Sequence, residues 1–170
     1  TTLVTETLLP EAHRMGDLVD DLLLLARADE TGLNPDADSV ALQVILEDEA
    51  ARLHRTTALT VDLIAAPAAV VGEHRALSRV VRNLADNAAR HARSRIELAT
   101  HTRGDAVVLI VADDGAGIAA ADRDRVFDRF VRLDTDRSRQ GGGSGLGLAI
   151  VAEIVAAHHG TISVGDRSGG

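Results

Sequence analysis

The first thirty residues carry apolar side chains at heptad spacing, which predicts an amphipathic helix over 1–30. Leu8, Met15 and Leu22 are seven residues apart, and Leu18 and Leu25 repeat the same interval. The two series interleave as the a and d positions of a heptad. One helix cannot bury its own stripe, so a partner helix is implied. A surface helix packed on its own domain is the alternative.

Beyond this helix the hydrophobic period alternates between that of a helix and that of a strand. A Gly-, Asn- and Pro-containing break predicts a linker over 31–39 and a second domain over 40–170. The helical segments are 42–55, 73–92, 122–132 and 145–158, and the strands are 59–64, 70–71, 94–101, 105–112 and 161–164. Strands 94–101 and 105–112 read as a hairpin that turns near Gly104. This order predicts an α+β fold in layers rather than a doubly wound sheet.

Composition narrows the function classes. The chain has 170 residues, 45% of them hydrophobic, with two Phe, no other aromatic residue and no Cys. Disulfides and thiolate metal sites are therefore excluded. A net charge of −8 argues against nucleic-acid binding, which needs a basic face. No apolar run is long enough to span a bilayer, no signal peptide is present, and the termini suggest a fragment.

Two asparagines on the predicted 73–92 helix suggest a ligand site. Asn83 and Asn87 are four residues apart, so they share one side of the helix, which Arg90 and His91 extend by a turn. Asn is a mediocre helix former because its amide competes for backbone hydrogen bonds. Its oxygen can bind Mg²⁺ as a hard ligand, and an arginine can bind phosphate. Two solvated asparagines are the alternative.

A second candidate site follows the strand at 105–112, where Asp113 and Asp114 precede Gly115 and Gly117. These glycines permit a tight turn and close approach of the backbone to a ligand. A carboxylate at the strand end can accept a hydrogen bond from an exocyclic amine. An ordinary acidic turn is the alternative.

Both Phe of the chain lie in one short segment. Phe127 and Phe130 are three residues apart, so they share one face of the helix predicted over 122–132. Core filling explains either Phe alone, but their pairing in a chain so poor in aromatics points to a specific role.

A glycine-rich loop precedes the last predicted helix. Gly143, Gly145 and Gly147 run into it within the sequence GGGSGLGLAI. Such a loop exposes backbone N–H groups, and a helix N-terminus favours anions. It is neither a Walker loop nor a Rossmann loop. Phosphate binding and a flexible linker are the two interpretations.

In this order and spacing the four segments resemble the nucleotide-binding boxes of histidine kinases. RNLADNAARHA resembles the N box, DDGAGI the first glycine box, VFDRFVRLD the F box and GGSGLGLAI the second glycine box. The resemblance covers about residues 39–164. The leading segment HRMGDLVDDLLLLARAD is similar to the second helix of the dimerisation and phosphoacceptor domain. That helix is absent from gyrases, heat-shock chaperones and mismatch-repair ATPases of the same fold.

The resemblance implies a two-layer α/β sandwich with helices on one face of a mixed sheet. One helix of a helical hairpin would precede it, and the final strand would be missing after Gly170. ATP and Mg²⁺ would be its ligands. Carried over by position, the ATP-binding residues are Asn83, Asn87, Arg90, His91, Asp113, Gly115, Gly117, Ile118, Phe127, Phe130, Gly143, Ser144, Gly145, Leu146 and Gly147.

The resemblance also assigns roles within that set. Asn87 would be the principal Mg²⁺ ligand with Asn83 beside it, and Arg90 and His91 would lie near the phosphates. Asp113 would accept the adenine amine. Residues 134–144 would form a lid, which the two Phe would anchor and couple to the dimerisation helices.

The chain departs from the family pattern in two places. The phosphoacceptor box, a His followed by Glu and then Pro, is absent, and His13 lies in the second helix of the pair. No catalytic residue is therefore expected in this fragment. Glu73 stands where the family usually has Asp before the N-box helix.

The implied reaction passes the ATP γ-phosphate to a His on a helix outside this chain, and then to a response-regulator Asp. The fragment would be inactive in cis and would make no membrane contact. The full-length protein would be a homodimer, with this segment on the cytoplasmic side of the bacterial plasma membrane. A degenerate ATP-binding regulatory module without kinase activity is one alternative. A dimeriser acting through the leucine-striped helix is another.

Overall fold

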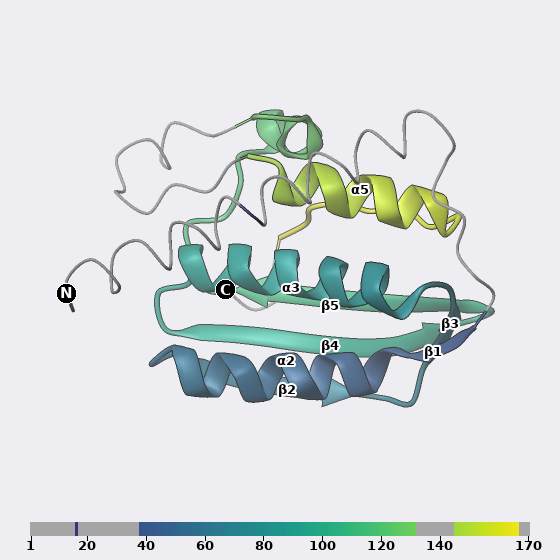
Figure 1. Ribbon diagram of the computed structural model, residues 1–170. Helices are drawn as coiled ribbons and strands as arrows, with labels where there is room; N and C mark the ends of the chain where they lie inside the picture. Colours follow the sequence, from purple (N-terminus) through teal and green to yellow (C-terminus); the bar gives the residue numbers. More distant parts are fainter. Residues whose placement is uncertain (1–15, 17–37, 132–144, 167–170) are drawn as a thin grey trace.

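The computed structural model describes Gly16, residues 38–131 and residues 145–166 (Figure 1). The predictions for the 1–30 helix, most of the linker, the 134–144 lid, Gly143 and Ser144 lie outside these residues. The elements in chain order are β1 (Ser39–Ala41), α2 (Leu42–Thr56), β2 (Thr60–Ala65), β3 (Ala69–Val71), α3 (His74–His91), β4 (Arg95–Arg103), β5 (Ala106–Asp113), two 3₁₀ turns (Ala120–Asp122 and Arg125–Phe127) and α5 (Gly147–Ala157).

The main sheet is mixed and has the order β2-β4-β5 in the described part of the chain. The central strand β4 pairs in parallel with β2 and antiparallel with β5. Its hairpin with β5 turns through Gly104, whose φ of 61° suits a residue without a Cβ. A separate antiparallel pair joins β1 to β3. Strand β1 is not predicted by the sequence pattern, because three residues are too short to show an alternation.

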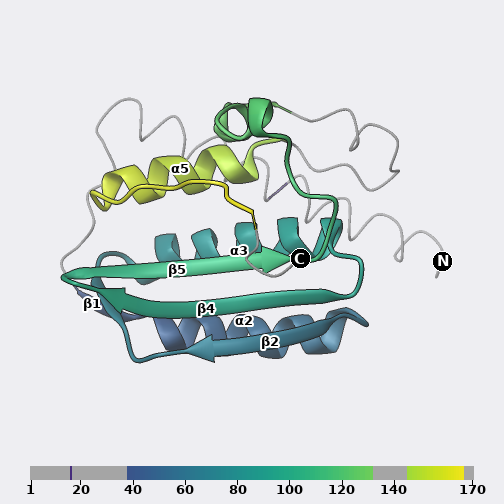
Figure 2. The same ribbon diagram turned by 180° about the vertical axis from the view of Figure 1, so that it is seen from behind.

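Helices α2 and α3 cover one face of this sheet, as the view from the open face shows (Figure 2). Helices α2 and α3 pack on it through fully buried residues such as Leu46, Val81 and Leu98. A second cluster joins α3 to α5, with Val80, Ile150 and Ile154 buried together with Ala76, Leu146 and Val151. The predicted α+β sandwich is therefore confirmed.

The helix predicted over 122–132 is wrong. Two three-residue 3₁₀ turns stand there instead, and the second ends where the Asp128 N–H donates to the Arg125 carbonyl. Asp128 is then extended and Phe130 has a φ of 64°, so a continuous helix is impossible. The two Phe consequently do not share a helical face.

The strand predicted over 161–164 is also wrong. No strand is assigned to these residues, although they follow α5 and run back along it (Figures 1 and 2). Ile162 instead packs against the cluster between α3 and α5. Its side chain is partly buried by packing on this cluster, and no strand pairing accompanies it.

Candidate functional site

Helix α3 places the two predicted asparagines on the side that meets α5. Both side chains are half-buried, and the Asn83 amide nitrogen donates to the carbonyl of Gly147 at 3.2 Å. Asn87 lies one turn closer to the C-terminal end of the same helix. Ala85 and Ala88 belong to the apolar face of α3, which is buried in the main core. Asn83 is therefore held at the junction of α3 and α5, and neither asparagine is fully exposed.

The end of β5 and the loop after it lie against the C-terminal end of α3. The Gly115 N–H donates to the Asp113 carboxylate at 2.8 Å. A Cβ added to Gly115 would come within 2.5 Å of both the His91 carbonyl oxygen and that carboxylate. The loop backbone therefore touches the last turn of α3, and only a glycine fits there. Gly117, with a φ of 71°, continues the turn toward the half-buried Ile118.

The neighbouring carboxylate, Asp114, has a role that the sequence analysis did not predict. It accepts hydrogen bonds from the backbone N–H groups of Arg93, Ser94 and Arg95, at 2.8–3.1 Å, and from the Ser94 hydroxyl at 2.6 Å. The hydrogen bond from the Ser94 hydroxyl has the largest effect and the backbone N–H groups add to it. Together they hold the pKa of Asp114 well below its usual range. Asp114 thus fixes the connection between α3 and β4. Nothing in the local sequence distinguishes the carboxylate predicted to bind a ligand, Asp113, from the one that holds the backbone, Asp114.

The N-terminus of α5 faces the same region. Its Leu146 side chain is buried, and the loop before it is tied to residue 130 by the Phe130 N–H donating to the Gly145 carbonyl at 3.0 Å. Gly145 has a φ of 73°, and a Cβ there would meet the Phe130 backbone at 3.0 Å. No side chain caps the first turn of α5 within the described residues. The predicted residues Gly145, Leu146 and Gly147 are therefore brought to the middle of α3, where Asn83 lies.

The two predicted Phe lie differently. Phe127 is half-buried, whereas Phe130 is 66% exposed. Val126 is the buried residue of this segment, which packs against α5 and is joined to it by an ion pair between Arg129 and Glu153 at 3.3 Å. Phe130 therefore does not fill the core of the part described.

Arg90 and His91 form the last turn of α3. Arg90 is exposed and His91 is half-buried, with its carbonyl beside Gly115. Together, the C-terminal half of α3, the loop after β5 and the N-terminus of α5 meet at one end of the helical layer (Figure 1).

The sequence of residues 72–170 matches the family of histidine kinase-, DNA gyrase B- and HSP90-like ATPases. This chain belongs to that family. The match includes all four motifs. It begins at Gly72, just before α3.

Among its relatives are sensor kinases. The chain is 34% identical over 174 residues to the sensor-like histidine kinase SenX3 of Mycolicibacterium smegmatis, covering 96% of this chain and 44% of SenX3. It is 42% identical over 166 residues to the probable sensor histidine kinase TcrY of Mycobacterium tuberculosis, covering 94% of this chain and 34% of TcrY. The chain thus spans less than half the length of these curated relatives.

Solved structures agree. Full-length ShkA, crystallised with AMPPNP, shares 28% identity and a TM-score of 0.78 over 95% of this chain and 35% of ShkA. Sequence and fold together identify the chain as an ATP-binding catalytic domain of the sensor histidine kinase type. No helix in the described ranges is long and apolar enough to cross a membrane.

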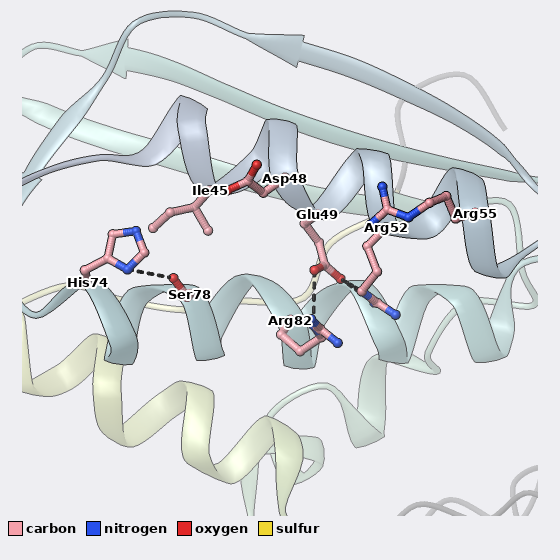
Figure 3. Close-up of a pocket in the computed structure, with 8 residues that line it drawn as sticks. All are labelled: Ile45, Asp48, Glu49, Arg52, Arg55, His74, Ser78 and Arg82. Atoms are coloured by element: carbon pink, nitrogen blue, oxygen red, sulfur yellow. Dashed lines mark hydrogen bonds and ion pairs between the residues drawn. The ribbon is translucent and has the colours of Figure 1, made fainter. Parts of the chain in front are cut away.

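This ATPase domain also has a groove of about 230 Å³ between α2 and α3 (Figure 3). It contains none of the predicted nucleotide-binding residues. Its centre is the buried Glu49, which binds Arg52 at 2.8 Å and Arg82 at 3.1 Å, while Arg52 also binds Asp86. The hydrogen bond to Glu49 raises the pKa of Arg52, against the opposing effect of burial. These ion pairs hold α3 against α2.

Proposed function

We propose that this domain binds Mg²⁺-ATP where α3, the loop after β5 and the N-terminus of α5 meet, and that it donates the γ-phosphate to a histidine on a separate helix. One observation carries the proposal. Segments far apart in the sequence converge there, through the Asn83–Gly147 hydrogen bond and the contact of Gly115 with the His91 carbonyl.

The adenine would lie at the end of β5. One oxygen of the Asp113 carboxylate already accepts the Gly115 N–H, which fixes the carboxylate's orientation. The other oxygen would accept the exocyclic amine of adenine. The glycine loop would let the base approach the backbone closely.

The phosphates would lie at the N-terminus of α5. The first N–H groups of a helix have no partner within it, and here no side chain of the described residues caps them. They therefore offer donors and a favourable potential for anions. Arg90 and His91, in the last turn of α3, would add positive charge and donors.

Magnesium would be bound mainly through the nucleotide. The described residues contain no group of three His, Asp, Glu or Cys side chains that could hold a metal ion. Mg²⁺ in phosphoryl-transfer sites commonly keeps waters and phosphate oxygens and takes one or two protein ligands. The half-buried Asn87 fits that role with its amide oxygen.

In the reaction, an imidazole nitrogen of the acceptor histidine attacks the γ-phosphorus. The bond from phosphorus to the β–γ bridging oxygen breaks, and ADP leaves. The domain contributes positioning and charge neutralisation, which is the main protein role in phosphoryl transfer. The phosphate would then pass to an aspartate of a response-regulator receiver domain.

The whole protein that contains this domain is proposed to be a homodimer, anchored in the bacterial plasma membrane, with this domain on the cytoplasmic side. The relatives are named as sensor histidine kinases, the class of protein to which this proposal assigns the whole protein. The acceptor histidine would then lie outside this chain, so transfer requires a second molecule here.

Binding of AMP-PNP measured by calorimetry tests the nucleotide site. We expect Mg²⁺-dependent binding, weakened about 10- to 100-fold by Asp113→Asn, because a hydrogen bond to a charged group contributes about 1.5–3 kcal/mol. Asp105→Asn makes the same change of charge in the exposed β4–β5 turn and is the matched control. Equal affinity for Asp113→Asn and the unchanged chain would refute the assigned adenine contact.

Phosphotransfer from radiolabelled ATP to a separately supplied dimerisation domain tests the kinase activity. Label on the acceptor histidine is the expected result. Nucleotide binding without transfer to a cognate acceptor would instead favour a regulatory ATP-binding module.

A further inference from the structure

The Asn83 side chain connects the middle of α3 to the first residue of α5. Its Nδ2 lies 3.2 Å from the carbonyl oxygen of Gly147. Because a carbonyl only accepts hydrogen bonds, the amide nitrogen and not the oxygen must face it. A Cβ added at Gly147 would have the Asn83 side chain as its nearest neighbour, at 3.7–3.9 Å, so this side chain lies directly over the first residue of α5.

Helix α3 is held firmly on its other side. Arg82 and Asp86, which flank this part of α3, join the ion pairs around the buried Glu49 of α2. On this side, Val81 and Ala85 are buried in the core cluster that α3 shares with α2 and the sheet. Among the described residues, the position of the α5 N-terminus relative to α3 therefore depends on the apolar cluster between the two helices and on the Asn83–Gly147 hydrogen bond.

We infer that Asn83 is a positioning residue: its amide N–H donates to the Gly147 carbonyl and thereby sets the place of the α5 N-terminal amides relative to Asn87. The inference rests on the proposed nucleotide site. It departs from the magnesium-ligand role expected for Asn83 from the resemblance. In this role Asn83 acts on the phosphates through α5.

Asn83→Asp separates the two roles. Aspartate keeps an oxygen in place and adds a negative charge, so a magnesium ligand would be retained or improved. It cannot donate, and its carboxylate would repel the Gly147 carbonyl. Asn83→Ala removes both donor and oxygen.

Hydrogen exchange without nucleotide tests the bond itself. In both Asn83 variants we expect the amides of Ile150 and Val151, in the first turns of α5, to exchange at least about 10-fold faster than in the unchanged chain. The Leu98 amide in β4 reports global unfolding and should keep its rate. Asn87→Ala is the matched control on the same helix and should leave Ile150 and Val151 unchanged. Unaltered protection of these two amides in Asn83→Asp would overturn the inference.

Calorimetry with AMP-PNP tests the consequence for the site. We expect Asn83→Asp to weaken binding about equally, roughly 10-fold, with Mg²⁺ and in EDTA, because the displaced α5 amides contact phosphate in both conditions. Retained affinity in EDTA with altered affinity in Mg²⁺ would show a magnesium ligand instead. If the unchanged chain binds no nucleotide, the proposed function fails, while the exchange experiment still decides on the Asn83–Gly147 bond.

Discussion

Two adjacent carboxylates at the end of β5 have separate roles. Asp113 accepts a single N–H from its own loop, whereas Asp114 accepts several from the segment that joins α3 to β4. The sequence motif predicted a ligand site at this position but could not assign different roles to the two carboxylates. The hydrogen-bond donors come from residues about twenty positions away, which no local pattern connects.

The Asp114 hydrogen bonds predict an acid-sensitive contribution to stability. Since its folded pKa lies below the unfolded value, the contribution is present above about pH 4 and is lost as the pH falls toward the folded pKa. The free energy of unfolding, measured with urea, should therefore fall more between pH 5 and 3 for the unchanged chain than for Asp114→Asn, whose residue 114 does not titrate. Equal losses of stability over this range would contradict the assignment.

Gly115 predicts a steric effect at one residue. In Gly115→Ala the new Cβ would overlap the His91 carbonyl, which is backbone and cannot move alone. We expect the free energy of unfolding to fall by about 1–3 kcal/mol, as in other overpacked sites. Gly165→Ala is the control, because no atom lies within 4 Å of its added Cβ, and should change stability by less than about 0.5 kcal/mol. Equal stability of the two variants would contradict the contact.

At the scale of elements, periodicity predicted those with long or strongly patterned segments. Helices α2 and α3 and the β4–β5 hairpin have nearly the predicted bounds. Periodicity gave the wrong element where contacts with distant segments determine the local conformation. Ile162 packs, partly buried, against the cluster between α3 and α5 without strand pairing, and Phe130 takes a left-handed conformation and donates its N–H to the Gly145 carbonyl. No pattern within one segment shows such partners.

Gly72, in the turn between β3 and α3, lies against His158 at the C-terminal end of α5. A Cβ at the buried Gly72 would lie 2.2 Å from Nε2 of His158, whose Nδ1 is held by the Ile154 carbonyl at 2.7 Å. We expect Gly72→Ala to lower the free energy of unfolding by about 1–3 kcal/mol. In the His158→Ala background the same change should cost well under ~1 kcal/mol, because the ring is gone.

Urea denaturation of the four proteins measures this cycle. The two single variants serve as each other's controls. The same cost for Gly72→Ala in both backgrounds would show that the ring does not limit the space at Gly72.

At the scale of the whole molecule, ligand binding should stabilise the domain. A nucleotide present at about 100 times its Kd adds about 2.7 kcal/mol. For a domain of this size that corresponds to a rise in Tm of roughly 5–10 °C. A thermal melt with Mg²⁺ and AMP-PNP measures it, and Asp113→Asn at the same concentration should shift less. An unchanged Tm at millimolar AMP-PNP would contradict nucleotide binding.

The fold class was predicted correctly from the sequence, and the four ordered motifs predicted that α3, the loop after β5 and the N-terminus of α5 would meet. The meeting itself depends on particular contacts, such as Asn83 with Gly147 and Gly115 with His91. These join residues distant in sequence through backbone atoms, which carry no sequence signal of their own.

The central strand β4 pairs with one neighbour that is close in sequence and one that is distant. Its hairpin with β5 closes through Gly104 and Asp105, whereas parallel pairing with β2 must first enclose residues 66–94, including α3. Closing the longer segment costs more chain entropy before any contact compensates for it.

The folding transition state should therefore contain the hairpin and α3, with β2 pairing only after the rate-limiting barrier. Truncating Leu109 should then slow refolding in stopped-flow experiments, whereas truncating Val61 should mainly accelerate unfolding.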